Sequence, residues 1–333
     1  MKSIRIKETY GLENVSIENE PVPAIQPNEV LVKVEAISLN QLDLMIAKGF
    51  FETPLPHTLG SDAAGQVVET GNLVSKLNIG DRVSTHFIHA WQSGPLQPGI
   101  LKTRLGMDRQ GVFSQYIALP ESAFVKIPAN LTYEQAATLP IAGVTAWEAL
   151  VNVGKLQAGQ TVLLQGTGGV AIFALQFAKA MGARVIITSG NDSKLARARL
   201  LGADETINYN TYPNWHEKVL ELTDGVGVDL TLEVSWADVG KTFEAMKIGG
   251  RVAVVGLLGG PKADFSVFGI MHKSLSVTGV QVGSKETFEA MNKAIEINDI
   301  KPVADRVYKL EEIAEAFRYL DQGGHFGKVV VSF

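Results

Sequence analysis

Three small residues at fixed spacing, Gly166, Gly168 and Ala171, form a G-x-G-x-x-A motif. In such a motif the first glycine permits a tight turn, and the second lets the backbone approach a pyrophosphate. The small third residue lets a helix pack closely on the preceding strand, and the N-terminus of that helix attracts phosphate charge. The motif therefore predicts a dinucleotide-binding turn that includes Gly169 and Val170. The alternative is a glycine-rich turn with a purely structural role.

The residues on either side of the motif supply the elements that it needs. Residues 161–164 are apolar or β-branched, which predicts a buried strand. Apolar side chains then recur every four residues at Phe173, Phe177 and Met181, which predicts one buried face of a helix. A strand, a tight glycine turn and a helix are the setting in which this motif binds a dinucleotide.

Strands and helices continue to alternate after this unit. We expect strands at 184–188, 205–208, 228–234, 251–255 and 276–280, and helices at 194–201, 215–222, 239–246 and 285–297. This rhythm predicts a doubly wound parallel sheet with helices on both faces. By contrast, the first ~120 residues are typical of short strands and turns. Residues 86–111 are expected to form a long surface loop, and the tail a strand, a helix and a strand.

Length and composition indicate a globular protein of two domains. The chain has 333 residues, 46% hydrophobic and 20% charged, which is too long for one ordinary core. A net charge of −5 without clustered Lys and Arg argues against a nucleic-acid partner. No apolar run approaches the roughly 20 residues of a membrane span, and no apolar leader is visible, so we expect a cytoplasmic protein. Cysteine is absent, which excludes disulfides and thiolate metal sites.

Several segments, in this order, resemble the medium-chain dehydrogenase/reductase superfamily. They are ISLNQLDLMIAKG (37–49), LGSDAAGQVVETG (59–71), GDRV (80–83), AATLPIAGVTAW (136–147), the glycine motif, and LLGADETINY (200–209). The resemblance covers essentially the whole chain. It implies an α/β protein with a GroES-like, mainly-β catalytic domain at 1–125 and 298–333, and a Rossmann NAD(P)-binding domain at 126–297.

Compared with the zinc alcohol dehydrogenases of this family, the chain lacks the expected metal ligands. The resemblance places Asn40 where they have a cysteine, Ser61 and Asp62 where they have His-Glu, and Ile141 where they have the third ligand. Zinc prefers thiolate, imidazole and carboxylate in a tetrahedral set, so we expect no metal. The chain instead resembles the zinc-independent branch typified by quinone oxidoreductases, whose pattern also has Asn and Asp at positions matching Asn40 and Asp43. An unrelated metal site is the alternative, built from His57, His86 and His89.

The end of the second strand of the expected Rossmann sheet bears on the choice of cofactor. NAD sites usually place Asp or Glu there to hold the ribose 2′-hydroxyl. Here Ser189 and Gly190 leave room and donors for a 2′-phosphate, and Lys194 adds positive charge unless it belongs to an ordinary solvated helix face. Asp192 opposes this interpretation, although it is expected to cap the helix of Lys194. We therefore expect NADPH in preference to NADH, with Tyr209 against the adenosine by resemblance.

The resemblance also implies where the remaining cofactor residues lie. Asn40 and Thr145 are expected at the nicotinamide end of the cofactor. Gly256 and Leu257 are expected along it, and Lys328 of the tail in contact with it. The alternatives for Asn40 and Thr145 are a turn amide and a helix-terminal hydroxyl with structural roles only.

The protein must supply an acceptor site and a proton, because hydride transfer is the chemistry of the nicotinamide. Quinones and α,β-unsaturated carbonyls are already electrophilic, whereas oxidation of an alcohol without zinc lacks its main charge stabiliser. Phe50, Phe51 and Trp91 are expected to stack a flat ring, or else to pack in the core or the lobe. Asp43 is expected among the catalytic residues, and Asp43, His86 and bound water stay open as the proton donor.

We therefore expect an NADPH-dependent oxidoreductase that transfers hydride to a quinone or an α,β-unsaturated carbonyl without a metal. The alternatives are an alcohol or aldehyde dehydrogenase of the same superfamily and a non-catalytic NADPH-binding protein. The expected partner is a small electrophilic substrate, with no nucleic acid or membrane. A homodimer through the Rossmann domains is also expected, because family members commonly pair through the sixth strand, here 276–280, and an exposed strand edge favours pairing.

Overall fold

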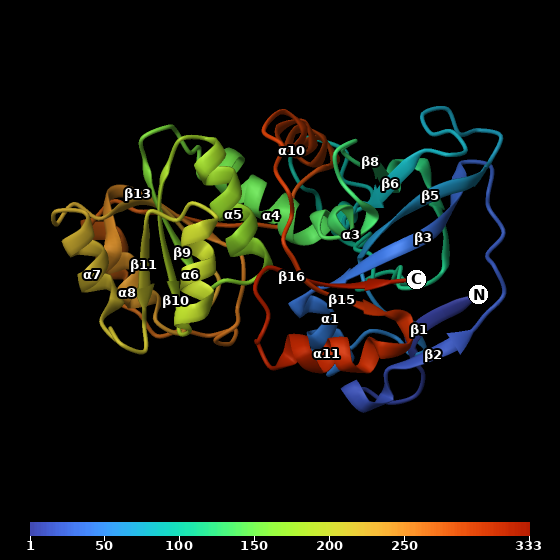
Figure 1. The fold of residues 1–333 in the computed structure, drawn as a ribbon, viewed down its shortest axis with the longest axis horizontal. Coiled ribbons are helices and arrows are strands. Elements are labelled where there is room, and N and C mark those ends of the chain that lie inside the picture. The colour runs from blue at the N-terminus through green and yellow to red at the C-terminus, as the bar shows by residue number, and fades with distance from the viewer. The chain divides into compact units, whose positions relative to one another are not determined.

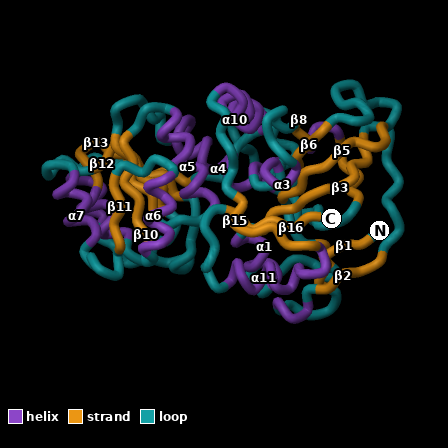
Figure 2. Tube along the Cα trace, viewed as in Figure 1, coloured by secondary structure: helices purple, strands orange, loops and turns teal.

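The computed structural model describes residues 1–333, and the chain divides into two compact units. Unit 1 comprises Met1–Val144 and Gly283–Phe333, and unit 2 comprises Thr145–Val282. Each unit has sheets of its own, as Figures 1 and 2 show. No helix of the structure has the length and apolar character that crossing a membrane requires.

Unit 2 is built on a six-stranded parallel sheet. In spatial order its strands are β11 (Glu205–Asn208), β10 (Arg184–Ser189), β9 (Thr161–Gln165), β12 (Val228–Glu233), β13 (Met246–Val254) and β14 (Ser276–Gly279). Counted along the chain this order is 3-2-1-4-5-6, which is that of a Rossmann fold and confirms the predicted doubly wound sheet. The helices of the unit are α5 (Gly169–Ala180), α6 (Asp192–Leu200), α7 (Trp215–Leu222), α8 (Val239–Ala245) and α9 (Val267–His272), together with α4 (Val144–Trp147) from Thr145 on.

The apolar patterns explain why the central elements of unit 2 form. Val162, Leu163 and Leu164 of β9 are all fully buried, as expected for a strand covered on both faces. On α5 the rings of Phe173 and Phe177 stack 5.7 Å apart, and both are buried. The strand and helix that flank the glycine motif are therefore fixed by packing.

Unit 1 contains a seven-stranded sheet and a smaller three-stranded one. The large sheet runs β15 (Ala304–Lys309), β16 (Lys328–Ser332), β3 (Glu29–Leu39), β5 (Asp62–Thr70), β6 (Arg82–Thr85) and β8 (Phe124–Lys126), and β7 (Tyr116–Pro120) pairs with β3. The small sheet runs β2 (Ser16–Asn19), β1 (Lys2–Ile6) and β4 (His57–Thr58). The helices are α1 (Gln41–Ala47), α2 (Pro98–Leu101), α3 (Tyr133–Ala136), α10 (Lys285–Ile297) and α11 (Ile313–Asp321).

The C-terminal tail completes the large sheet of unit 1. Strand β16 pairs antiparallel with β3, with Val329 opposite Leu39, and parallel with β15. In Figure 1 the red β16 accordingly runs beside the blue β3. The tail thus adds two strands and α11 to the unit that begins at the N-terminus, as expected from the resemblance.

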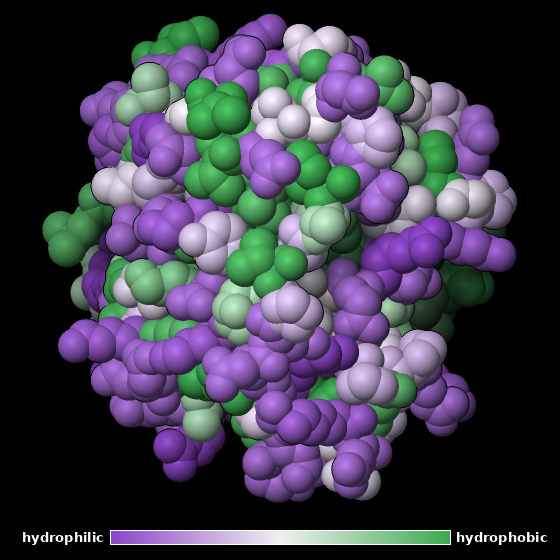
Figure 3. All heavy atoms as spheres, turned by 90° about the vertical axis from the view of Figure 1, so that its right-hand side faces the viewer, coloured by the Kyte–Doolittle hydropathy of each residue, from purple (hydrophilic) through white to green (hydrophobic).

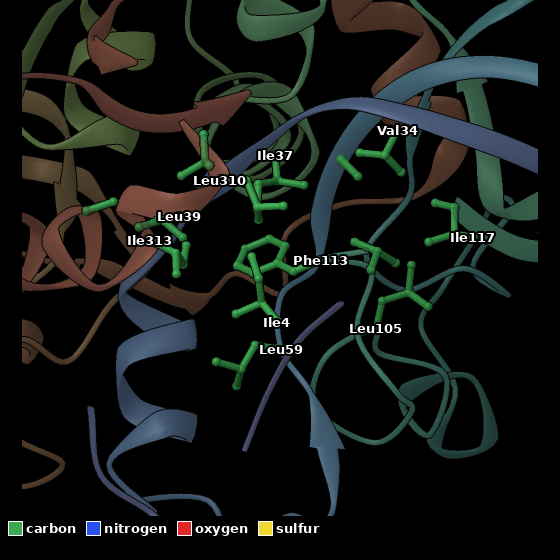
Figure 4. Close-up of a cluster of buried hydrophobic side chains, with 14 of the residues drawn as sticks. Ile4, Val34, Ile37, Leu39, Leu59, Leu105, Phe113, Ile117, Leu310 and Ile313 are labelled. Atoms are coloured by element: carbon green, nitrogen blue, oxygen red, sulfur yellow. The ribbon is translucent and has the colours of Figure 1, made fainter. Parts of the chain in front are cut away.

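Unit 1 has one large buried apolar cluster and a smaller one around Ala36, Ile127 and Val330. Figure 4 shows side chains from distant parts of the chain converging on the large cluster, among them Ile4, Phe113 and Ile313. Gly60 has a positive φ of +86°, and a Cβ there would lie 2.0 Å from the ring of Phe113, so only glycine fits beside this ring. On the outside, Figure 3 shows mainly hydrophilic side chains with hydrophobic residues in small groups.

The division into units differs from the domain boundaries expected at 126 and 298. Helix α10, which the sequence-based division assigns to the cofactor domain, belongs to unit 1. Its Lys285 backbone N–H donates to the Trp91 carbonyl at 2.9 Å, and its Asn292 side chain donates to the Lys126 carbonyl at 3.0 Å. These contacts, which periodicity along the sequence does not reveal, explain the difference.

Candidate active site

The end of β3 brings Asn40 and Asp43 together in unit 1. Asn40 is the N-cap residue of α1, directly after Leu39. The Asp43 carboxylate oxygen Oδ2 accepts a hydrogen bond from the Asn40 backbone N–H at 2.7 Å, a common arrangement at a helix start. Both side chains are buried, with 7% of Asn40 and 1% of Asp43 exposed.

A buried lysine from the tail reaches the same place. Lys328, the first residue of β16, donates from Nζ to the Leu39 carbonyl at 2.6 Å and to Asn40 Oδ1 at 2.5 Å. Its Nζ also lies 3.9 Å from Oδ2 of Asp62, the first residue of β5. The side chains of Lys328 and Asp62 are 4% and 0% exposed, so this ion pair is almost completely removed from water.

Burial governs the protonation of this cluster. Burial raises the pKa of Asp43 to about 8. The hydrogen bond from the Asn40 N–H lowers this pKa, the negative charge of Asp62 raises it further, and the positive charge of Lys328 lowers it. Burial also raises the pKa of Asp62 against the charge of Lys328, and lowers the pKa of Lys328 against the charges of both carboxylates. Charge balance favours an ammonium–carboxylate pair between Lys328 and Asp62, which lie 3.9 Å apart. A pKa of about 8 keeps Asp43 mostly protonated at neutral pH.

Two polar atoms of the cluster lack a hydrogen-bond partner within the chain. They are Nδ2 of Asn40 and Oδ1 of Asp43. Buried polar atoms are normally paired, so unpaired ones in a functional cluster favour a ligand, a substrate or a water as the missing partner. The amide can donate one hydrogen bond there and the protonated carboxyl can donate a proton.

His86 is a poor candidate for the proton donor that the sequence left open. Its ring is fully buried, and Nε2 lies 3.1 Å from the Trp91 carbonyl, so this nitrogen carries the proton. Burial lowers the pKa of His86 to about 4. The imidazole is therefore neutral at physiological pH, and its N–H is already donated to a carbonyl.

The low pKa of His86 predicts acid sensitivity. Because its pKa falls from 6.5 to about 4 on folding, its contribution to stability is complete above pH 6.5 and is lost as the pH falls towards 4. Wild type should lose up to about 1.4 kcal/mol of stability per pH unit through this group. Urea denaturation from pH 4 to 8 would show a shallower slope for His86→Asn than for wild type. The control, His272→Asn on exposed α9, should keep the wild-type slope, and a wild-type slope for His86→Asn would contradict the prediction.

The three aromatic residues proposed for a substrate pocket lie in different surroundings. Phe50 is 53% exposed and meets Phe51 edge-on, with ring centroids 5.1 Å apart. Phe51 packs against the core of unit 1 and also lines a surface groove with Pro54 and Met107. Trp91 is 8% exposed and donates its ring N–H to the Gly94 carbonyl at 2.8 Å. Trp91 therefore packs inside the lobe, the alternative left open above, and only the phenylalanines present ring surface.

In unit 2 the glycine motif forms the turn between β9 and α5. Gly166 has a φ of +75°, in the region that favours glycine, and no atom lies within 4 Å of the position of a Cβ there. Gly168 caps the helix, which starts at Gly169 and Val170. The first backbone N–H groups of α5 thus lie beside an open turn, as a phosphate-binding site requires.

The end of β10 matches the expected 2′-phosphate position in part. Ser189 is its last residue, and its Oγ accepts from the Asn191 N–H at 3.3 Å. The expectation that Asp192 caps α6 is wrong, because Asn191 is the cap and accepts from the Lys194 N–H at 3.2 Å. The Asp192 carboxylate instead accepts from Asn208 Nδ2 at 2.7 Å.

Four further predicted cofactor residues follow strands of the sheet, namely Gly190, Tyr209, Gly256 and Leu257. A Cβ on Gly190 would lie 2.8 Å from the ring of Tyr209, which is 44% exposed, so glycine lets this ring approach the backbone closely. Gly256 follows β13, and a Cβ there would lie 2.8 Å from the Val234 carbonyl. Leu257 is 38% exposed. Thr145, buried in α4, belongs to unit 2, whereas Asn40, Asp43 and Lys328 belong to unit 1.

Sequence reasoning missed Glu233, a fully buried carboxylate at the end of β12. Its Oε1 accepts from the N–H groups of Ser235 and Trp236, each at 2.9 Å. Its Oε2 accepts from Gln165 Nε2 at 2.8 Å and from Thr242 Oγ1 at 2.6 Å. Glu233 therefore ties the residue before the glycine turn to the loop after β12. A charged residue closing the apolar strand VDLTLE was the available signal.

Glu233→Gln should weaken both the fold and the glycine turn. The amide group presents one oxygen and one NH2 to four donors, so at least one donor is left unpaired at a cost of about 1–3 kcal/mol. Urea denaturation should show this loss, and the NADPH dissociation constant should rise several-fold. Glu244→Gln, at a side chain that is 66% exposed, is the control. Unchanged stability and NADPH binding in the Glu233 variant would contradict the role given to this carboxylate.

A parallel 3-2-1-4-5-6 sheet with a glycine turn at the start of a helix is the architecture of a Rossmann domain. Together with a β-rich unit that holds a buried polar cluster, it indicates an oxidoreductase. Comparison with known proteins agrees. Residues 26–129 match the alcohol dehydrogenase GroES-like domain, and residues 169–296 match the zinc-binding dehydrogenase domain. The chain belongs to the medium-chain dehydrogenase/reductase superfamily.

Its relatives bear several names. The chain is 38% identical to a zinc-type alcohol dehydrogenase-like protein of Schizosaccharomyces pombe, over 97% of this chain and 96% of that protein. It is 29% identical to the quinone oxidoreductase of Homo sapiens, over 99% and 97% of the two chains. The solved structure of a putative alcohol dehydrogenase from Sinorhizobium meliloti covers 100% of this chain and 98% of its own, with 39% identity and a TM-score of 0.94.

The zinc that one domain description implies does not fit the residues present here. The positions expected for zinc ligands hold an amide, a hydroxyl and an aliphatic side chain, in Asn40, Ser61 and Ile141. The hydroxyl of Ser61 is already donated to Asp62 Oδ1 at 2.8 Å, and Asn40 Oδ1 accepts from the ammonium of Lys328. The described chain also holds no group of three or more His, Asp or Glu side chains suited to a metal ion.

Proposed function

We propose that this chain is an NADPH-dependent oxidoreductase that transfers hydride to a quinone or an α,β-unsaturated carbonyl without a metal. The observation that carries the proposal is the pair of unpartnered groups Asn40 Nδ2 and Asp43 Oδ1. One is an N–H donor, and the other belongs to a carboxyl whose pKa, at about 8, keeps it protonated at neutral pH. Together they suit a carbonyl oxygen that gains negative charge as hydride arrives.

The electron and proton count follows from these roles. Hydride donation is the chemistry of the reduced nicotinamide. An enone accepts hydride at its β-carbon and one proton at the resulting enolate; a quinone accepts hydride and one proton to give the hydroquinone. Asn40 binds the carbonyl oxygen in either case. Asp43 supplies the proton and is then reprotonated from solvent.

The preference for NADPH rests on the end of β10. Ser189 and Gly190 place no carboxylate where NAD sites usually have one, and the nearest carboxylate, of Asp192, is engaged by Asn208. Lys194 lies in the first turn of α6 and supplies a cation for the 2′-phosphate. Tyr209 presents its ring over Gly190, where we place the adenosine.

A panel of quinones, enones, alkenals and alcohols, run with and without chelator, tests the proposal. NADPH oxidation at 340 nm with quinones or enones, unaffected by chelator, is expected. Chelator-sensitive oxidation of alcohols, with one zinc per chain, would instead establish an alcohol dehydrogenase, the activity named for two of the similar proteins. NADPH binding without turnover of any acceptor would establish a non-catalytic nucleotide-binding protein.

We further propose a homodimer through the edge strand β14. All four residues of β14 are exposed, and the strand has no neighbour on its outer side within the chain. Exposed apolar side chains gather on β14 and α9, including Val277, Phe268 and Met271, and such groups favour association. Light scattering should give twice the chain mass for wild type and the chain mass for Val277→Asp. Leu200→Asp, at a residue 88% exposed on α6, should stay dimeric. A monomeric wild type would contradict the proposal.

A further inference from the structure

The three positions that match zinc ligands of the zinc alcohol dehydrogenases are all connected to one buried ion pair. Asn40 Oδ1 accepts from Lys328 Nζ at 2.5 Å. The Ser61 hydroxyl donates to Asp62 Oδ1 at 2.8 Å, and the Ile141 N–H donates to Asp62 Oδ2 at 3.3 Å. The pair therefore connects the end of β3, the start of β5 and the π-helical segment Leu139–Gly143, which a metal ion would otherwise join through its ligands.

Charge balance gives the lysine a central place. Two carboxylates face Lys328 within this cluster, Asp62 from β5 and Asp43 from α1. Burying an unpaired carboxylate is very costly. The ammonium of Lys328 balances the charge of Asp62, and Asp43 stays neutral by keeping its proton. The ammonium is thus the single cation on which the burial of this cluster depends.

The lysine also fixes the orientation of the Asn40 amide. An ammonium has only donors, so the amide must turn its oxygen towards Lys328, and it does. The amide nitrogen then has no hydrogen bond of good geometry within the chain, although the Asn40 side chain is close enough to Asp62 to lower the pKa of that carboxyl. A neutral side chain at position 328 would let the amide rotate.

We propose that the ammonium of Lys328, paired with Asp62, takes the place of a catalytic metal ion as the fixed cation of this site and orients Asn40 as a hydrogen-bond donor. The orienting part of the proposal rests on the proposed function, and the cation part does not. Lys328 and Asp62 are positioning residues, because they act through Asn40.

Binding of a metal cation tests the cation part of the proposal, and it requires no substrate that accepts hydride. Lys328→Ala leaves Asp62, Asp43 and the amide oxygen of Asn40 without their cation, and oxygen ligands suit Mn²⁺. Titration followed by the electron paramagnetic resonance of free Mn²⁺ should show one ion bound per chain in Lys328→Ala and none in wild type. Lys328→Ala/Asp62→Asn should bind none. Lys48→Ala, which frees exposed Asp321 from an ion pair at 2.5 Å, is the control. Absence of Mn²⁺ binding by folded Lys328→Ala would overturn the cation role; if that variant does not fold, Lys328→Gln replaces it.

Kinetics test the orienting part. In Lys328→Met/Asp62→Asn both charges are removed, which commonly restores stability to a chain that has lost one partner of a buried pair. This double variant should melt at a higher temperature than Lys328→Met, yet its kcat should stay at least tenfold below wild type while its dissociation constant for NADPH changes less than threefold. Lys328→Arg should recover part of kcat. A double variant with wild-type kcat would show a purely structural pair. Absence of turnover by wild type itself would overturn the proposed function and leave the Mn²⁺ result as the test of the cation role.

Discussion

Asp43→Asn is expected to lower kcat for enone reduction by about 10²- to 10⁴-fold, the usual contribution of a general acid. The change keeps an oxygen that can accept from the Asn40 N–H, as Oδ2 does at 2.7 Å. It removes the proton that the carboxyl would give to the enolate. The rate of enone reduction by wild type should also fall above pH 8, because Asp43 loses that proton near its pKa of about 8.

The same substitution should not destabilise the chain, and this separates a chemical role from a structural one. The pKa of Asp43 rises from 3.8 to about 8 on folding. A carboxyl with a raised pKa contributes most below pH 3.8 and loses that contribution as the pH rises through 8. Asparagine cannot ionise, so Asp43→Asn should become more stable relative to wild type between pH 4 and 8.

Steady-state kinetics and urea denaturation, both followed from pH 5 to 9, check this pair of expectations. Asp321→Asn, at the exposed end of α11, is the control and should change neither. Wild-type kcat in the Asp43 variant would remove Asp43 from the mechanism. A loss of kcat that is matched by a loss of stability would give Asp43 a structural role instead.

Lys194→Ala is expected to raise the dissociation constant of NADPH by about tenfold to a hundredfold, because hydrogen bonds to charged groups contribute about 1.5–3 kcal/mol. The dissociation constant of NADH should change less than threefold, since only NADPH carries a 2′-phosphate. The preference for NADPH should weaken further in high salt, which screens exposed charges.

Quenching of intrinsic fluorescence by each nucleotide measures both constants. Arg199→Ala is the matched control, because it removes the same charge from the same helix, where its Nε donates to Thr206 Oγ1 at 2.9 Å. Equal weakening of both nucleotides by Lys194→Ala would show that the lysine contacts a part they share. Tighter binding of NADH by wild type would overturn the NADPH proposal.

The cofactor-binding sheet was readable from the sequence because its signals are local. Strand 205–208 and helices 215–222 and 285–297 lie where they were predicted, and β10 and β12 differ by one residue at one end. In a parallel sheet each strand is a continuous apolar run and each crossover an amphipathic helix. Glycines mark the turns between them. Each strand or helix can therefore be predicted from a short stretch of consecutive residues.

What the sequence did not reveal depends on partners far away in the chain. Helix α10 has the correct bounds, but its assignment to unit 1 depends on Trp91 and Lys126. Asp192 is the first residue of α6, and Asn191 before it provides the cap, while the Asp192 carboxylate accepts from Asn208. Both Asn and Asp are common N-cap residues, so the sequence alone does not show which of two neighbours will cap a helix.

The site residues divide in the same way. The resemblance named Asn40, Asp43 and Lys328, and the structure brings these three together. Asp62 was noticed only as a lost zinc-binding position, since the pairing with Lys328 spans 266 residues (328 − 62). Trp91 is aromatic and near other candidates in sequence, but its burial depends on the fold of the 86–111 lobe.

The place of β16 in the large sheet sets the order in which a nascent chain can be completed. Asp62 leaves the ribosome 266 residues (328 − 62) before Lys328, which at common rates of synthesis is roughly 10 to 50 s. During that interval Asp43 and Asp62 have no Lys328 beside them, and β3 lacks β16, one of its partner strands. Residues 145–282 form a contiguous unit. Unit 2 can therefore fold completely before the last strand of unit 1 has been synthesised. Translation that stops before β16 therefore yields a complete unit 2 beside an unfinished unit 1, in which one edge of β3 is unpaired.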